Sequence, residues 1–224
     1  GTGKHQRTVP LPDIRNKPKN RLFRHRTRNF LRRRVWRYFR WLSYKNPSEY
    51  LSSITRTLCV YTDAEFKAGE NIIDNWSLMH ACFFHSDELK FTAAHTNLAL
   101  GQSLATLSEA PYRAEIWQTA DGATHLINLV RDAQSSLVRV WAMELLQRDH
   151  QQATSQIDMK ILVALLKHSD TRVQEFSSQL FRDHQGLANM TVSAWLEVLA
   201  QSDRSLLPMI CEAMTKHVAS ARLD

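Results

Sequence analysis

The apolar positions at the start of the chain follow a helical period. From residue 23 they recur every three or four positions, which predicts an amphipathic helix ending near Asn46-Pro47. Pro47 then suits the first turn of a second helix, so the two form a helical hairpin. The expected inner faces are Phe30, Leu31, Val35, Tyr38, Phe39 and Leu42 in the first helix, and Tyr50, Leu51, Ile54 and Leu58 in the second.

The middle of the chain has a less regular pattern. Residues 71–95 mix aromatic and polar side chains, whereas residues 93–107 are small and rich in alanine, the best helix former. We expect helices at about 64–84, 87–107 and 111–118.

From Asp121 onward, one unit recurs: a short apolar helix end, a polar turn and the start of a second helix. Val138 and Val173 are 35 residues apart, and Asp170 and Asp203 are 33 apart. A period of this size indicates stacked helical hairpins. The matching segments are LVRDAQSSLV at 129–138, LLKHSDTRV at 165–173 and VLAQSDRSLL at 198–207, and Arg-Asp-His follows the second helix at 148–150 and at 182–184.

The repeat predicts which residues lie in the core and which lie in turns. Asp170 and Asp203 are expected at inter-helix turns, where a short carboxylate caps the following helix. The residues expected to be buried are Leu129, Val138, Trp141, Leu145, Leu162, Leu165, Val173, Phe176, Leu180, Trp195, Leu199 and Ile210.

The stretch LLKHSDTRVQEFSSQLF, with Asp in the turn and Val and Gln just after it, resembles a HEAT repeat. The resemblance covers about 121–224 and weakens upstream, where His-Ser-Asp recurs at 85–87. The whole chain is also similar to HEAT-like regions of large bacterial multidomain proteins, some of which carry a WGR domain. The resemblance implies a right-handed α-solenoid and brings no catalytic residue with it.

The composition also favours an all-α fold. Only 6 Gly and 6 Pro occur in 224 residues, too few for a many-stranded sandwich or for glycine loops that cradle phosphate. Three of the prolines fall in residues 1–22, which we expect to be an extended basic arm. Residues 23–120 would then hold the N-terminal helical hairpins, and residues 121–224 the HEAT-like repeats.

Charge is divided unevenly along the chain. Residues 1–60 contain 16 Lys and Arg against 2 acids, a net +14, whereas residues 61–224 contain 13 against 20, a net −7. A basic segment of this density attracts phosphate or an acidic protein surface, and it can also fold back on acidic residues of its own chain.

The first helix carries eight arginines between residues 24 and 42 and no lysine. Arginine binds carboxylate or phosphate through two donors and stacks on aromatic rings. We expect Arg33, Arg37 and Arg40 to share an exposed face, with Arg28 and Arg32 in a second row. The candidate binding residues are Arg24, Arg28, Arg32, Arg33, Arg34, Arg37 and Arg40; the alternative is a solvated helix whose arginines pair with Asp63, Glu65, Glu70 and Asp74.

Other candidate sites are weaker. Trp36 and Trp41 could stack on bases. However, residues five positions apart do not share a helix face well, and Trp36 is expected to pack in the protein interior. The one cluster of metal-ligand residue types lacks the usual zinc spacing, so no metal is expected. That cluster is His80, Cys82, His85 and His95.

No constellation of residues indicates an enzyme or a cofactor. The Gly-Thr-Gly-Lys at residues 1–4 lacks the strand and hydroxyl of a phosphate loop, and Gly101-Gln102-Ser103 lacks the second glycine of a nucleophile elbow. Three unpaired-looking cysteines and the absence of a long apolar run favour a cytoplasmic protein that does not enter membranes.

We therefore expect a non-enzymatic α-solenoid scaffold, one part of a larger protein, whose partner is another protein or domain. The alternative is binding of DNA or RNA through the Arg-rich segment. A HEAT-like DNA glycosylase is a third, weaker interpretation, because no Asp and aromatic pair marks its pocket.

Overall fold

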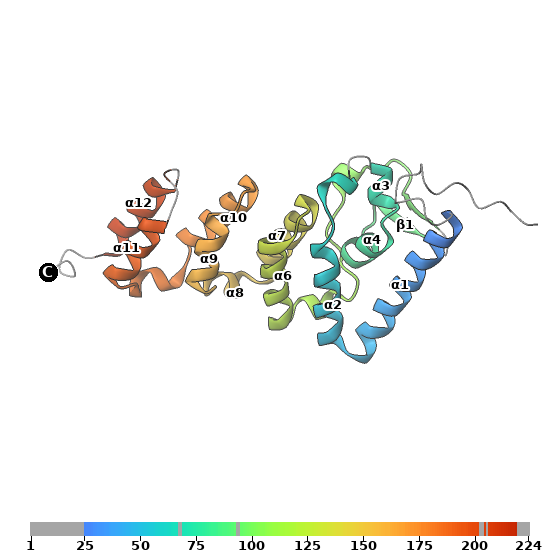
Figure 1. The fold of residues 1–224 in the computed structure, drawn as a ribbon, viewed down its shortest axis with the longest axis horizontal. Helices are drawn as coiled ribbons and strands as arrows, with labels where there is room; N and C mark the ends of the chain where they lie inside the picture. Colours follow the sequence, from blue (N-terminus) through green and yellow to red (C-terminus); the bar gives the residue numbers. More distant parts are fainter. Residues whose placement is uncertain (1–24, 67–68, 93–94, 202–203, 205, 219–224) are drawn as a thin grey trace, which may run out of the picture.

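The protein is mostly helical, as expected from its composition. A computed structural model describes residues 25–66, 69–92, 95–201, 204 and 206–218. The expected arm lies outside these residues. In the described part, α1 (His25–Lys45) lies at one end of the long axis and α12 (Leu207–His217) lies at the other (Figure 1).

The first two helices form the expected hairpin. Helix α1 spans His25–Lys45 and α2 spans Pro47–Cys59, and the two pack against each other. The side chain of Asn46 caps α2 by accepting a hydrogen bond from the Glu49 amide at 3.2 Å. The predicted inner face of α2 is confirmed, since Tyr50, Leu51, Ile54 and Leu58 are all buried.

The single helix expected at 64–84 is wrong. The chain instead forms η3 (Asp63–Phe66), α3 (Gly69–Ile73) and α4 (Trp76–Phe83). Asp74 and Asn75 make the turn between the last two, and the Asn75 amide donates to the Ile72 carbonyl at 2.9 Å. Short polar side chains favour such turns over helix interiors.

The helix expected at 87–107 is also wrong. Strands β1 (Leu89–Phe91) and β2 (Thr96–Leu98) pair antiparallel, and the Thr92 hydroxyl donates to the His95 carbonyl across their turn. The Phe91 ring packs 4.5 Å from that of His80 on α4, and this burial outweighs the helix propensity of the alanines.

After the hairpin the chain makes only short turns. Gly101 has φ +78°, a left-handed conformation that ends any helix there, and η4 (Leu104–Thr106) follows. Of the helix expected at 111–118, only one turn forms, α5 (Ala114–Trp117).

Helix α4 is buried along its whole length and carries a histidine inside an aromatic cluster. The His80 ring stacks on Trp76 with centroids 4.6 Å apart and lies 5.0 Å from the Trp36 ring. Its Nδ1 lies 2.8 Å from the Trp76 carbonyl oxygen and donates to it. Desolvation lowers the pKa of His80 to about 4, so the ring is neutral at pH 7.

The second half contains three helix pairs in the order the repeat predicts. Residues 133–135 and 167–170 form turns between paired helices, as expected. Short helices α8 (Gln151–Ser155) and η5 (Gln185–Asn189) connect the pairs. The pairs are α6 (Ala120–Asp132) with α7 (Ser136–Asp149), α9 (Met159–Leu166) with α10 (Thr171–Arg182), and α11 (Val192–Gln201) with α12 (Leu207–His217).

The core expected from the repeat is largely confirmed. Ten of its twelve residues are buried, from Leu129 to Ile210. Leu180 and Leu199 are half-buried and pack against the same core. The periodic positions therefore identify the inner faces of these helices correctly.

The histidines of the two Arg-Asp-His segments make equivalent hydrogen bonds to backbone carbonyl groups. His150 Nε2 donates to the Trp117 carbonyl at 2.9 Å, and His184 Nε2 donates to the Ile157 carbonyl at 2.7 Å. The Gly186 amide donates to Nδ1 of His184, which leaves the proton on its Nε2. Each histidine thus connects the C-terminal end of a helix, α7 or α10, to the backbone of an earlier segment by a hydrogen bond.

Asp170 lies at the turn before α10, as predicted, and it makes a second contact that the repeat does not predict. Its Oδ1 caps α10 by accepting from the Arg172 amide at 3.0 Å, and its Oδ2 accepts from Arg139 Nε at 2.9 Å. Arg139 is 8% exposed and also donates to the Ala133 carbonyl at 2.7 Å. The equivalent Asp203 lies outside the described residues.

Asp63 makes a similar contact from the N-terminal half. Its carboxylate accepts from the Ser136 amide at 2.7 Å and from the Ser135 hydroxyl at 3.0 Å, at the start of α7. Partial burial opposes ionisation of Asp63, but these hydrogen bonds lower its pKa overall. A side chain distant in sequence therefore caps α7.

We predict that Asp170→Ala destabilises the protein more than loss of a cap alone. The substitution removes the cap and leaves Arg139 buried without its carboxylate, which costs about 3–5 kcal/mol. Asp158 is the matched control, because it caps α9 through the Lys160 amide at 2.8 Å and has no ion pair with a described residue. Asp158→Ala should cost about 0.5–2 kcal/mol.

Urea unfolding followed by circular dichroism measures both costs. Asp170→Asn separates the two roles, since the amide oxygen retains the cap and the charge is lost. Equal costs for Asp170→Ala and Asp158→Ala would show that the ion pair adds nothing to stability.

We also predict that stability falls as the pH drops from 7 to 5. The pKa of His80 is about 4 in the folded chain and about 6.5 when unfolded, so the unfolded state binds more protons in this window. The contribution of His80 to the free energy of unfolding is nearly constant above pH 6.5. Below this pH it decreases, by about 2 kcal/mol at pH 5. Urea unfolding across this range should show a shallower slope for His80→Phe, and an unchanged slope would contradict the assignment to His80.

Candidate functional site

The candidate arginines whose side chains are described occupy two different environments on α1. Arg24 precedes the described residues, and Arg28 lies in α1 with its side chain outside the described atoms. Arg32 and Arg33 are half-buried. The exposed members of the set are Arg34, Arg37 and Arg40.

The half-buried arginines face the N-terminal half of the protein. Arg32 Nη1 lies 3.6 Å from the carboxylate of Asp74, one of the acids named as alternative partners, and Arg33 Nε donates to the Asn29 carbonyl at 3.2 Å. Both line a cleft of about 380 Å³ between α1, the turn before α4, and β2. Arg33 is thus less exposed than expected. Both side chains lie beside the cleft and not on the exposed side of α1.

The exposed arginines keep their charge uncompensated. None of Arg34, Arg37 and Arg40 forms an ion pair with a described residue. Of the acids proposed as their partners, Asp63 caps α7, and Glu65 accepts from the Thr62 amide at 2.9 Å. The outer side of α1 therefore presents positive charge to solvent.

The apolar face expected for α1 is wrong in most of its members. Trp36, Phe39 and Leu42 are buried, because the Trp36 ring fits between His80 and Tyr112 with centroids 5.0 and 5.1 Å away. This turns a second apolar arc outward. Its members Phe30, Leu31, Val35 and Tyr38 are 44–49% exposed, and Trp41 is 55% exposed.

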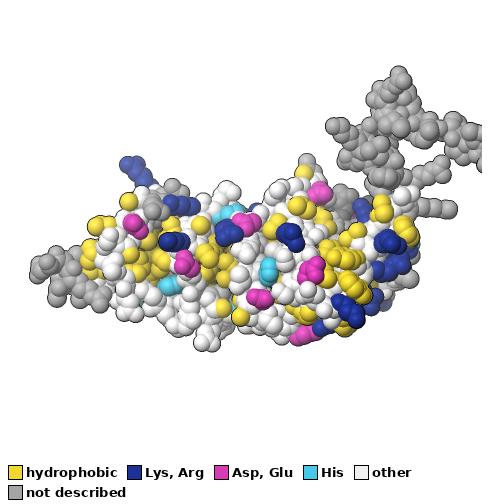
Figure 2. Space-filling model, turned by 60° about the horizontal axis from the view of Figure 1, so that its bottom comes forward, with side chains coloured by type: hydrophobic (Ala, Val, Ile, Leu, Met, Phe, Trp, Pro, Cys, Tyr) yellow, Lys and Arg dark blue, Asp and Glu magenta, His cyan; other side chains and the backbone are white. Residues whose placement is uncertain are grey.

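Exposed large apolar side chains are concentrated on this one helix. Six of the nine such residues in the described chain are on α1, and the other three are Val60, Leu100 and Leu196. Figure 2 shows apolar side chains bordered by dark blue Lys and Arg at the end of the molecule where α1 lies. We call Phe30, Leu31, Arg34, Val35, Arg37, Tyr38 and Trp41 the α1 outer face.

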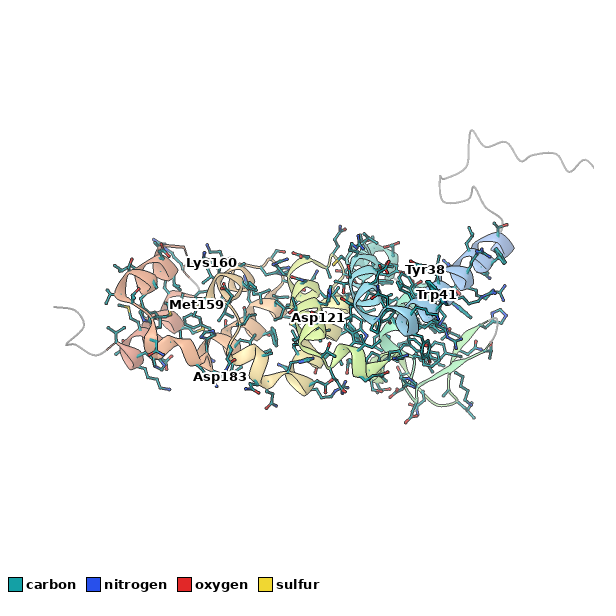
Figure 3. The ribbon with its side chains drawn as sticks, turned by 90° about the horizontal axis from the view of Figure 1, so that it is seen from below. Tyr38, Trp41, Asp121, Met159, Lys160 and Asp183 are labelled. Carbon is teal, nitrogen blue, oxygen red and sulfur yellow. The ribbon has the colours of Figure 1, made fainter. Side chains whose placement is uncertain are left out.

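Aromatic contacts order part of this surface. The rings of Tyr38 and Trp41 lie 6.0 Å apart at 33°, and Figure 3 shows both on α1, in the right half of the view, with Met159 in the left half. Beyond them, the Arg113 guanidinium lies 4.3 Å over the Tyr44 ring. The Tyr112 hydroxyl and the Arg113 guanidinium stabilise the Tyr44 phenolate and lower its pKa.

In the described ranges, no three His, Cys, Asp or Glu side chains converge as a metal site would require. His80 is held inside its aromatic cluster, and burial raises the pKa of the Cys82 thiol well above its usual value. Among these same residues, no helix has both the length and the apolar character that a bilayer crossing requires.

Sequence reasoning identified the arginines but not the orientation of the helix that carries them. The available signal was the presence of apolar residues on two arcs of α1 at once, including Trp36 on one and Trp41 on the other. A helix that is apolar on more than one side has more than one packing face.

We predict that the α1 outer face contributes little to folding. Tyr38→Ser and Trp41→Ser should each change the free energy of unfolding by no more than about 0.5 kcal/mol. Trp36→Ala, on the same helix but buried, should cost about 3–5 kcal/mol. Urea unfolding measures all three, and a Trp41→Ser cost equal to that of Trp36→Ala would assign the exposed ring to the fold.

Comparison with known proteins identifies no relative. A scan against protein-family models, a search of the curated proteins and a search of the solved structures each find no match.

Proposed function

We propose that this chain is a non-enzymatic scaffold that binds another protein through the α1 outer face. In this proposal, its helices form a right-handed HEAT-like α-solenoid within a larger protein. The succession of helix pairs along the long axis supports this architecture (Figure 1). So do the equivalent contacts of His150 and His184, because they recur with the sequence repeat.

The exposed apolar arc of α1 is the observation that carries the proposal. Single exposed apolar residues are normal on protein surfaces, but contiguous patches mark interaction sites. Here six of the nine exposed large apolar residues of the described chain lie on one helix, and the other three are scattered over different segments. Such an arc costs solubility unless a partner covers it.

Nucleic-acid binding is the alternative, and the uncompensated charges of Arg34, Arg37 and Arg40 favour it. Single-strand binders, however, place aromatic rings where bases can stack on them. The arc on α1 includes Leu31 and Val35, which are exposed. Aliphatic side chains of this kind are suited to contact with another protein, because they have no ring on which a base can stack. A protein partner uses both kinds of side chain.

We predict that polar substitution of the arc removes a protein partner. The full chain, a triple variant with Leu31→Ser, Val35→Ser and Tyr38→Ser, and a matched variant with Val60→Ser, Leu100→Ser and Leu196→Ser serve as baits in extracts of the source cells. Both variants replace three exposed apolar side chains, so their effects on solubility are comparable. After nuclease treatment, quantitative mass spectrometry should find a protein that the first variant loses at least about tenfold and the second retains.

Two outcomes would reject the scaffold function. Identical protein sets for the three baits would show that α1 recruits nothing. Absence of any α1-dependent protein, together with DNA or RNA that the full chain but not the α1 variant recovers in a parallel experiment without nuclease, would support the nucleic-acid alternative.

A further inference from the structure

The apolar side chains of the α1 outer face have the spacing of a helix-docking seam. Leu31, Val35, Tyr38 and Trp41 follow one another at intervals of four, three and three residues. Residues at these spacings lie on one side of a helix and recur in helix–helix interfaces. With a rise of about 1.5 Å per residue, the seam extends for about 15 Å, or roughly three turns of a partner helix.

One arginine lies inside this seam. Arg34 is four residues after Phe30, four before Tyr38 and three after Leu31, so apolar side chains adjoin it along the helix. It is exposed and has no ion pair with a described residue. A helix that covers the seam must bury this guanidinium, and burial of arginine is tolerated when a carboxylate meets it with two hydrogen bonds.

Charge narrows the choice of occupant. Residues 1–24 carry seven Lys and Arg against one acid, so the chain's own N-terminal segment repels α1. A second α1 placed face to face would bring Arg34 and Arg37 against the same cations, and like charges across an interface cost several kcal/mol. An occupant with acidic side chains is complementary.

A membrane surface suits the seam less well than protein does. Arg34 within the apolar arc would enter the acyl region if α1 lay on a bilayer, whereas interfacial helices keep cations on the opposite, polar face. A partner helix can place a carboxylate at that point.

We infer that the α1 outer face docks an acidic amphipathic helix of a partner protein, with a partner Asp or Glu paired to Arg34 inside the apolar seam. This inference rests on the proposed function and adds the chemistry of the partner. Leucine-like side chains of the partner cover Leu31, Val35 and Tyr38. Acidic side chains at its edge face Arg37.

The test uses the full chain and a displayed library of three-heptad helices. Each helix has a fixed leucine seam, flanking positions randomised among Glu, Lys and Gln, and one seam position randomised among Asp, Glu and Leu. Selection on the full chain should enrich Glu at the flanks and a carboxylate at the seam position. A synthetic peptide of the selected sequence then provides dissociation constants by fluorescence anisotropy.

Matched variants locate the peptide on α1. Val35→Ser and Arg34→Gln should each weaken binding at least about tenfold, whereas Leu196→Ser and Arg182→Gln, at exposed positions on α11 and α10, should leave it unchanged. Arg34→Lys should recover part of the affinity, since lysine keeps the charge without the two-pronged geometry. A higher salt concentration should weaken the binding of a peptide whose flanking positions are Glu, because salt screens its attraction to the arginines.

Each contrary result identifies a different occupant. No enrichment, enrichment of Lys, or binding unaffected by Val35→Ser overturns the inference. So does tighter binding to duplex DNA or to phosphatidylserine vesicles than to the peptide, or self-association in sedimentation that Val35→Ser abolishes. If the cell-extract baits recover an α1-dependent protein while the library fails, the scaffold function stands and its partner is not an acidic helix.

Discussion

The largely buried ion pair between Arg139 and Asp170 holds α6, α7 and α10 in one arrangement. One guanidinium joins three segments: α7, which carries it; the end of α6, through the Ala133 carbonyl; and the start of α10, through Asp170. A charge taken out of water must be fully partnered, so α10 has one acceptable register against α7. A shift of α10 against α7 by one residue would leave the Arg139 guanidinium buried without its carboxylate.

Similar polar links continue along the long axis. Asp63 caps α7 from the N-terminal half, His150 reaches the Trp117 carbonyl, and His184 reaches the Ile157 carbonyl. In each case a side chain satisfies backbone groups of a neighbouring segment. The inner side of α1 instead packs through the Trp36 ring against His80 and Tyr112, whereas the apolar residues of its outer face are exposed.

The sequence predicts what is local and periodic, and much less of what depends on distant contacts. The step from Val138 to Val173 identifies helix pairs and buried faces, because each pair repeats the same local pattern. The cap role of Asp170 follows in the same way, but its partner Arg139 is 31 residues away and lies outside the repeat argument.

Two errors have the same physical origin. The strand at Leu89–Phe91 forms because Phe91 packs against His80, a contact that no helix propensity can report. The orientation of α1 depends on which of its two apolar arcs meets α4, and the fit of Trp36 beside His80 decides that. The exposure of Arg37 and Arg40 was therefore predictable from the sequence, whereas the half-buried position of Arg33 was not.

The arrangement of these links also determines how the protein responds to force. Helices α1 and α12, the first and last of the described chain, lie at opposite ends of the long axis (Figure 1). Tension between them loads the boundaries between successive helix pairs in series, and each pair contacts mainly its neighbours. Polar links at separate boundaries, such as those of His150 and His184, would then break one after another. A partner held on α1 would be tethered through an element that extends in steps.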